Sequence, residues 1–135
     1  MYHYIEDKEF LKRMKSLCSN IVNQLVQSIN NDSVMTVGAH LVGSGARNLI
    51  TQNANEPIDL DYNLCVLEVL EISFNNCQAI KEYIRKHFNK VLNQNGWGDC
   101  QDSTSALTTE YRHFTKGNKT EFKIDLAIVR ERCYG

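Results

Sequence analysis

The residues best suited to chemistry are three aspartates in two largely apolar segments. Asp59 and Asp61 lie within residues 58–67, a segment that alternates apolar and polar residues as a strand does. Side chains two residues apart on a strand share a face, with Cα atoms about 6–7 Å apart. Asp125 lies in the middle of the apolar segment 121–129, although aspartate is depleted in strands and is rarely buried without a partner. We therefore expect these carboxylates to have a function.

Carboxylates gathered on one face of a sheet indicate a metal site. Three like charges repel one another, and a bound divalent cation with its preference for oxygen ligands offsets the repulsion. Two cations held by shared carboxylates are typical of phosphoryl and nucleotidyl transfer, because one activates the attacking hydroxyl and the other stabilises the leaving phosphate. Two alternatives stay open: Asp59 and Asp61 on a solvated strand face, and Asp125 paired with Lys123 or with a helix lysine.

A glycine–serine turn precedes the first two aspartates. Gly43 and Ser44 follow a predicted strand and precede a predicted helical turn, a position where backbone N–H groups suit phosphate. The Ser44 hydroxyl can donate to a phosphate oxygen, and Arg47 and Asn48 are near enough in sequence to help. The segment has neither the GxxxxGK[ST] nor the GxGxxG pattern. An ordinary turn is the alternative.

Hydrophobic periodicity predicts the elements that must hold these residues. Apolar residues recur every three or four positions in two segments and alternate in 58–67 and 121–129, while 34–42 is rich in β-branched and small residues. In order, we expect a helix over 6–30, a strand over 34–42, a short helical turn over 46–52, a strand over 58–67, a helix over 75–94 and a hairpin of 104–114 with 121–129. This order predicts an α+β fold, with a mixed β-sheet of about four to five strands and helices packed on one face.

Composition limits the class of protein. The chain has 135 residues, a formal net charge of −1, 42% hydrophobic and 23% charged residues, which excludes a disordered or collagen-like chain. No apolar run approaches the roughly 20 residues of a membrane-spanning helix, and the N-terminus is unlike a secretory signal. The near-neutral charge argues against a broad basic surface for nucleic acid. We expect one cytoplasmic domain over 1–135, without a membrane partner. We expect it to act through a localised site and not through a broad charged surface.

The cysteines and histidines show no metal-binding spacing. The five cysteines include no CxxC, and the four histidines include no HExxH or HxxxH. A disulfide framework and a zinc site are therefore not expected. The pattern favours small buried side chains for Cys18, Cys65 and Cys77.

The motifs together resemble the nucleotidyltransferase superfamily of the DNA polymerase β type. Its pattern is a hydrophobic residue followed by Gly-[Gly/Ser], a spacer, [Asp/Glu]-hydrophobic-[Asp/Glu] and a third acidic residue in a hydrophobic strand. Gly43 and Ser44, then Asp59 and Asp61, then Asp125 follow this pattern in order. The resemblance covers roughly residues 34–129 and implies the polymerase β-like fold.

The resemblance also implies roles for these residues. Gly43 and Ser44 would hold the triphosphate of a nucleoside triphosphate such as ATP. Asp59 and Asp61 would coordinate two Mg²⁺ or Mn²⁺ ions, and Asp125 would complete the site of the ion that activates the acceptor hydroxyl. The implied reaction transfers a nucleoside monophosphate to a hydroxyl and releases pyrophosphate.

Two further residues are candidates for binding the nucleotide. Lys123 shares the parity of Asp125 and can touch phosphate, with a plain surface lysine as the alternative, and Arg47 lies near the glycine–serine turn. The acceptor stays open among a small molecule, a nucleotide, an RNA end and a protein hydroxyl.

The sequence departs from the family pattern in two respects. Residues 45–58 form a slightly long spacer, and only ten residues follow Asp125, where many members continue into a helical domain. We expect either a minimal member or, more in keeping with the abrupt end, a fragment that lacks this domain.

Two other functions and one segment stay open. A non-catalytic nucleotide-binding or protein-interaction module, as in antitoxin-like members, is the main alternative. An Asp-x-Asp glycosyltransferase is disfavoured by the glycine–serine turn and the short chain. Residues 111–116 mix cations with aromatics and can contact RNA, but we favour an exposed hairpin tip.

Overall fold

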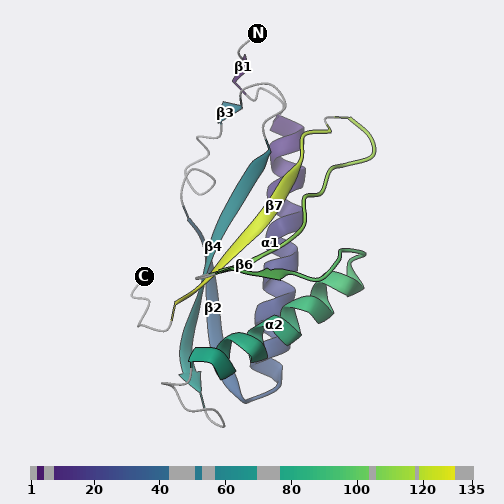
Figure 1. Ribbon diagram of the computed structural model, residues 1–135. Helices are drawn as coiled ribbons and strands as arrows, with labels where there is room; N and C mark the ends of the chain where they lie inside the picture. The colour runs from purple at the N-terminus through teal and green to yellow at the C-terminus, as the bar shows by residue number, and fades with distance from the viewer. Residues whose placement is uncertain are drawn as a thin grey trace.

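The computed structural model of the protein shows a mixed β-sheet with two helices on one side (Figure 1). It describes residues 3–4, 8–42, 51–52, 57–69, 77–103, 106–117 and 119–129. The elements are β1 (His3–Tyr4), α1 (Lys8–Asn31), β2 (Met35–Val42), β3 (Thr51–Gln52), β4 (Ile58–Val69), α2 (Cys77–Gln94), β5 (Gln101–Asp102), β6 (Ala106–Thr108) and β7 (Phe122–Val129). The predicted α+β class, the mixed sheet and its covered face are confirmed.

The main sheet has five strands in the order β2-β4-β7-β6-β5. The two central strands, β4 and β7, are parallel, while every other neighbouring pair is antiparallel. Parallel strands need a long connection, and the chain between β4 and β7 includes α2, β5 and β6. The two acidic segments predicted from the sequence thus become neighbours in the middle of the sheet.

The core lies between the helices and one face of the sheet. Alternate residues of the central strands are buried against the helices, and the residues between them lie on the other face, as their parity predicts. Both helices bury the stripe that their periodicity predicts. The residues of the two central strands in this core are Ile58, Leu60, Tyr62, Leu64, Val66, Phe122, Ile124 and Leu126, while Cys65 is also buried but has the other parity.

The structure corrects two local predictions. Thr51–Gln52, within the predicted helical turn 46–52, instead form β3 and pair with β1; residues 46–50 lie outside the described part of the chain. The first arm of the hairpin is shorter than predicted, because the Thr109 hydroxyl accepts a 2.9 Å hydrogen bond from the Ile124 N–H where a backbone carbonyl would continue the ladder.

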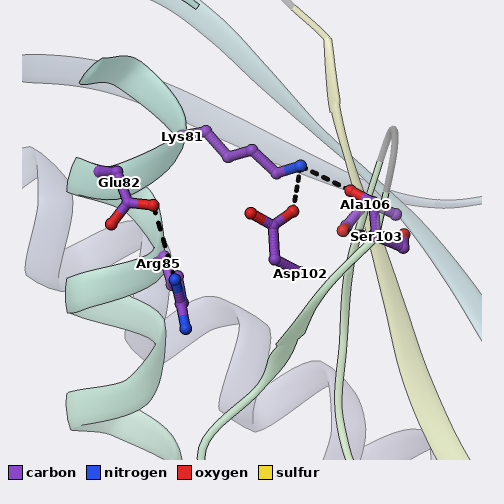
Figure 2. Close-up of polar contacts among 6 residues, drawn as sticks. All are labelled: Lys81, Glu82, Arg85, Asp102, Ser103 and Ala106. Carbon is purple, nitrogen blue, oxygen red and sulfur yellow. Dashed lines mark hydrogen bonds and ion pairs between the residues drawn. The ribbon is translucent and has the colours of Figure 1, made fainter. Parts of the chain in front are cut away.

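The edge strand β5 was not expected and is held by α2 (Figure 2). The Lys81 ammonium pairs with the Asp102 carboxylate and donates a 2.6 Å hydrogen bond to the Ser103 carbonyl. The Ser103 N–H and hydroxyl both donate to the Ala106 carbonyl, at 2.9 and 3.0 Å. Contacts with α2 and with the start of β6 therefore fix a two-residue strand whose sequence has no strand periodicity.

The predicted burial of the cysteines is confirmed only in part. Cys18 is buried, and burial raises the pKa of its thiol to about 12. Cys65 is also buried, as predicted, but it is disulfide-bonded, which the spacing of the cysteines did not lead us to expect. Cys77 is exposed, because it is the first residue of α2 and precedes the buried stripe. No helix in the described part of the chain combines the length and apolar character needed to cross a membrane.

A histidine joins α1 to α2. The Ser28 hydroxyl and His87 Nδ1 lie 2.8 Å apart, and His87 Nε2 lies 3.5 Å from the Asp32 carboxylate. The Tyr83 hydroxyl donates a 2.6 Å hydrogen bond to the same carboxylate. Burial lowers the pKa of His87, although Asp32 opposes part of this effect. The junction therefore favours a neutral imidazole.

This junction predicts that the protein loses stability on mild acidification. As the pH falls through 6.5, the unfolded chain binds a proton at His87 before the folded protein does, so the free energy of unfolding begins to decrease near this pH and continues to decrease until the pH is below the lowered pKa of the folded protein. The Asp32 pKa is lowered by its bond with Tyr83, so Asp32 loses its contribution only at much lower pH. Urea denaturation should show a weaker pH dependence in His87→Gln, whereas His113→Gln, at an exposed histidine, should keep the wild-type slope. Equal slopes in all three proteins would contradict this assignment.

Candidate active site

The three predicted carboxylates lie on the sheet face away from the helices. In the parallel register of the central strands, Asp61 of β4 lies directly opposite Asp125 of β7, and Asp59 lies opposite Lys123. Neighbouring strands are about 4.8 Å apart, and residues two apart on one strand about 6.6 Å. The fold thus brings together four residues that are up to 66 positions apart in sequence (59 to 125).

Lys123 is the cation among these acids. Its ammonium lies 3.5 Å from the Asp125 carboxylate and 5.3 Å from the centre of the Tyr111 ring. The Lys123 and Asp125 side chains are only 18% and 24% exposed. Lys123 is thus a half-buried partner of the carboxylates rather than a plain surface lysine, and the alternative in which Asp125 pairs with Lys123 is realised in the structure.

The pKa shifts indicate that the positive charge of Lys123 does not fully offset the negative charges of the three aspartates. Burial raises the pKa of Asp61, and the Asp125 and Asp59 charges and a hydrogen bond between the Asp61 and Asp125 carboxyl groups raise it further. Burial also raises the pKa of Asp59, where Lys123 opposes the effect and Asp125 adds to it. Burial by itself lowers the pKa of Lys123, but Asp125 and Asp59 raise it more, so its net shift is upward. Together the acids favour bound cations or protons.

The residues fit a divalent cation in their chemistry, and the strand register brings them to one face of the sheet. They offer carboxylate oxygens, the ligands that Mg²⁺ and Mn²⁺ prefer, and the register places two of them directly opposite each other and a third on the same face. Within the described ranges, however, no group of three or more His, Cys, Asp or Glu side chains is arranged to hold a metal ion. The backbone register therefore brings the three carboxylates to one face of the sheet. The Asp125 carboxylate pairs with Lys123 there.

The predicted phosphate-binding residues Gly43, Ser44 and Arg47 lie outside the described residues. The strand that leads to them is described, and its last residue, Val42, lies opposite Asp61. The chain therefore leaves β2 beside the carboxylates. The roles of the three residues remain predictions.

Thr108 is a site residue that the sequence analysis missed. It lies opposite Asp125 on the other neighbouring strand, β6, and shares its face. The hairpin was predicted, but the register that pairs these two residues depends on the interruption at Thr109. No pattern in the sequence predicts the interruption at Thr109.

The segment 111–116 is not simply an exposed hairpin tip. Arg112 forms a bridge with Phe122 and lies over the Trp97 ring at 5.5 Å, on the helix side of the sheet. Phe114 packs against Phe122 at 5.2 Å, with the Arg13 guanidinium 4.0 Å from its ring centre. Arg112 and Phe114 therefore pack against residues of the core. Within 111–116, exposure is confirmed for Tyr111, His113, Thr115 and Lys116, and Gly117 directly after them is exposed with φ +80°.

Comparisons with known proteins give a match in structure only. No family model and no curated protein matches the chain. The crystal structure of the Cid1 poly(U) polymerase is similar, with a TM-score of 0.51 and 17% identity over 93% of this chain and 32% of that one. A cytoplasmic RNA terminal U-transferase is similar with a TM-score of 0.49 and 18% identity, over 88% of this chain and 30% of that one. The chain thus spans about a third of the length of these proteins, and the likeness to Cid1 is one of fold.

Proposed function

We propose that this chain, which has the fold of the polymerase β-like nucleotidyltransferases, is the catalytic core of a metal-dependent nucleotidyltransferase. It transfers a nucleoside monophosphate from a nucleoside triphosphate to a hydroxyl and releases pyrophosphate. One observation carries the proposal: Asp59, Asp61 and Asp125 share the open face of the two central strands, with Asp61 directly opposite Asp125. Nucleotidyl transfer with two cations needs such a set of carboxylates.

The carboxylates of Asp59, Asp61 and Asp125 would hold two Mg²⁺ or Mn²⁺ ions. When bound, the ions lower the pKa of the acceptor hydroxyl and stabilise negative charge on the leaving phosphate. Lys123 lies within the same face and offsets charge on phosphoryl oxygens through its ammonium. Gly43, Ser44 and Arg47, in the segment after β2, hold the triphosphate of the substrate. A cytoplasmic location belongs to the same proposal.

The similarity to a poly(U) polymerase indicates which substrates to test first. UTP is the first nucleotide and an RNA 3′ end the first acceptor, because the solved protein of similar fold is named for polymerising U. The test incubates the protein with Mg²⁺, each labelled nucleoside triphosphate in turn and a single-stranded RNA. We expect pyrophosphate release and an extended RNA with at least one of the four triphosphates.

Binding of the substrate is expected to stabilise the protein. A ligand at 100 times its Kd adds about 2.7 kcal/mol to the free energy of unfolding, which for a domain of this size raises Tm by roughly 10 °C. We therefore expect a clear rise in Tm with Mn²⁺ plus nucleoside triphosphate, measured by thermal shift, and little rise in Asp61→Asn. A matched control is Glu68→Gln, which alters an exposed carboxylate on the same strand. If no triphosphate changes Tm, the proposal is wrong.

The second candidate is a non-catalytic module on the same fold. The pairing of Asp125 with Lys123 and the absence of a metal-holding arrangement among the described side chains favour it. Such a module would gain little stability from metal and nucleotide, and it would release no pyrophosphate. The two measurements above therefore separate the candidates.

A further inference from the structure

Tyr111 is an exposed aromatic residue beside the carboxylates. It is 46% exposed and, with Leu67, one of two exposed large hydrophobic residues in the described part of the chain. A tyrosine ring combines an apolar body with a polar hydroxyl, which suits it to binding surfaces beside polar groups. Leu67 lies near the far end of β4, whereas Tyr111 adjoins Lys123.

The backbone sets the side of the sheet on which Tyr111 lies. Its neighbour Arg112 exchanges two backbone hydrogen bonds of 2.8 Å with Phe122, so these two side chains share the helix side. Between the pairings of Thr109 with Ile124 and of Arg112 with Phe122, this segment has one residue more than β7, and Tyr111 lies on the opposite side, which is the face of Lys123 and Asp125. The 5.3 Å distance from the Lys123 ammonium to the centre of the Tyr111 ring agrees with this placement.

Tyr111 is held in position by its neighbours. Arg112 lies over the Trp97 ring and pairs with Glu110 at 3.1 Å, and Glu110 accepts a 2.9 Å hydrogen bond from the Gly98 N–H. The residues on both sides of the tyrosine in sequence are therefore fixed to the segment after α2. A rigid aromatic ring that loses little freedom on binding is well suited to stacking.

We propose that Tyr111 stacks on the terminal base of the acceptor, so that the acceptor is the 3′ end of a single-stranded nucleic acid. This inference rests on the proposed function, since it concerns the acceptor hydroxyl of the proposed reaction. Lys123 links the ring to Asp125, and an ammonium beside an aromatic ring attracts the phosphate that accompanies a stacked base. Base stacking on an aromatic ring tolerates any base, because every base has a π-face.

The test compares two acceptors in the nucleotide-transfer assay. One is a single-stranded RNA, and the other is the same RNA with an abasic 3′-terminal residue that keeps its hydroxyl. Tyr111→Ala is expected to raise KM for the intact RNA about 10-fold, without changing KM for the nucleoside triphosphate. Tyr111→Phe, which keeps the ring, should behave as the wild type, as should the control Leu67→Ala.

The abasic acceptor shows whether the lost contact is the terminal base. The wild type should bind it about as poorly as Tyr111→Ala binds intact RNA, and Tyr111→Ala should bind it no worse than the wild type does. An unchanged KM in Tyr111→Ala, or equal losses on both acceptors, would overturn the proposal. So would efficient transfer to a protein hydroxyl with no transfer to RNA.

A binding assay separates this inference from the proposed function. If the wild type transfers no nucleotide to any acceptor, the proposed function fails. Fluorescence anisotropy of the same two RNAs without metal then still tests the tyrosine. Tighter binding of intact than of abasic RNA, lost in Tyr111→Ala and kept in Tyr111→Phe, supports stacking, and equal binding of both RNAs overturns it.

Discussion

Replacing Asp125 with asparagine is expected to reduce nucleotidyl transfer by about 1,000-fold, equivalent to about 4 kcal/mol of transition-state stabilisation. Asparagine has nearly the same shape, so the backbone pairing of Asp125 with Asp61 and Thr108 should persist. What is lost is the third carboxylate, and with it the charge that helps to hold the ion next to the acceptor hydroxyl. The measurement is the rate of pyrophosphate release at saturating Mg²⁺ and nucleoside triphosphate.

Two comparisons show that the loss is chemical. Glu68→Gln removes an exposed carboxylate from β4 away from the site, and it should retain full activity. Circular dichroism of Asp125→Asn should match the wild type. Without metal, Asp61→Asn should be more stable than the wild type, because it relieves repulsion from its neighbours, whereas Asp125→Asn also loses the pair with Lys123. Full turnover in Asp125→Asn would show that the carboxylates have another role.

The second large effect is expected on stability, from Phe122→Ala. Phe122 is 1% exposed and begins β7, where its ring packs against Phe10, Trp97 and Phe114 at centroid distances of 6.4, 6.4 and 5.2 Å. Deleting a buried phenylalanine ring removes apolar contacts and leaves a cavity. The expected cost is about 3–5 kcal/mol in the free energy of unfolding, measured by urea denaturation.

The same substitution also tests how the core supports the site. Phe122 directly precedes Lys123, and its backbone exchanges hydrogen bonds with Arg112, so a disturbed start of β7 should also weaken nucleotide transfer. Phe122→Leu keeps much of the apolar volume and should cost far less, about 1–1.5 kcal/mol. His113→Ala, at an exposed neighbour of the same segment, should leave stability unchanged within about 0.5 kcal/mol. A loss below about 1 kcal/mol in Phe122→Ala would show that the aromatic cluster is not part of the cooperative core.

Much of the fold was predictable because the long elements have clear periods. The two long helices and the strands β2, β4 and β7 lie within a few residues of their predicted ranges, since their buried stripes are continuous. The short strands were not predictable. Two residues carry no period. Strand β5 depends on its pairing with β6 and on Lys81 of α2, which contacts Asp102 and Ser103, and β3 depends on its pairing with β1.

The sequence by itself determined which residue types are available for chemistry and which faces the aspartates and Lys123 share. Parity along a strand is a local property, so Asp59 with Asp61, and Lys123 with Asp125, could be placed on shared faces before any partner was known. Only the tertiary structure decided which strands become neighbours and in which register. The parallel pairing of β4 with β7 sets Asp61 opposite Asp125, and the bridge at Arg112 turns Tyr111 to their side. These are pairings between distant segments, and the packing of the whole core against α1 and α2 selects them.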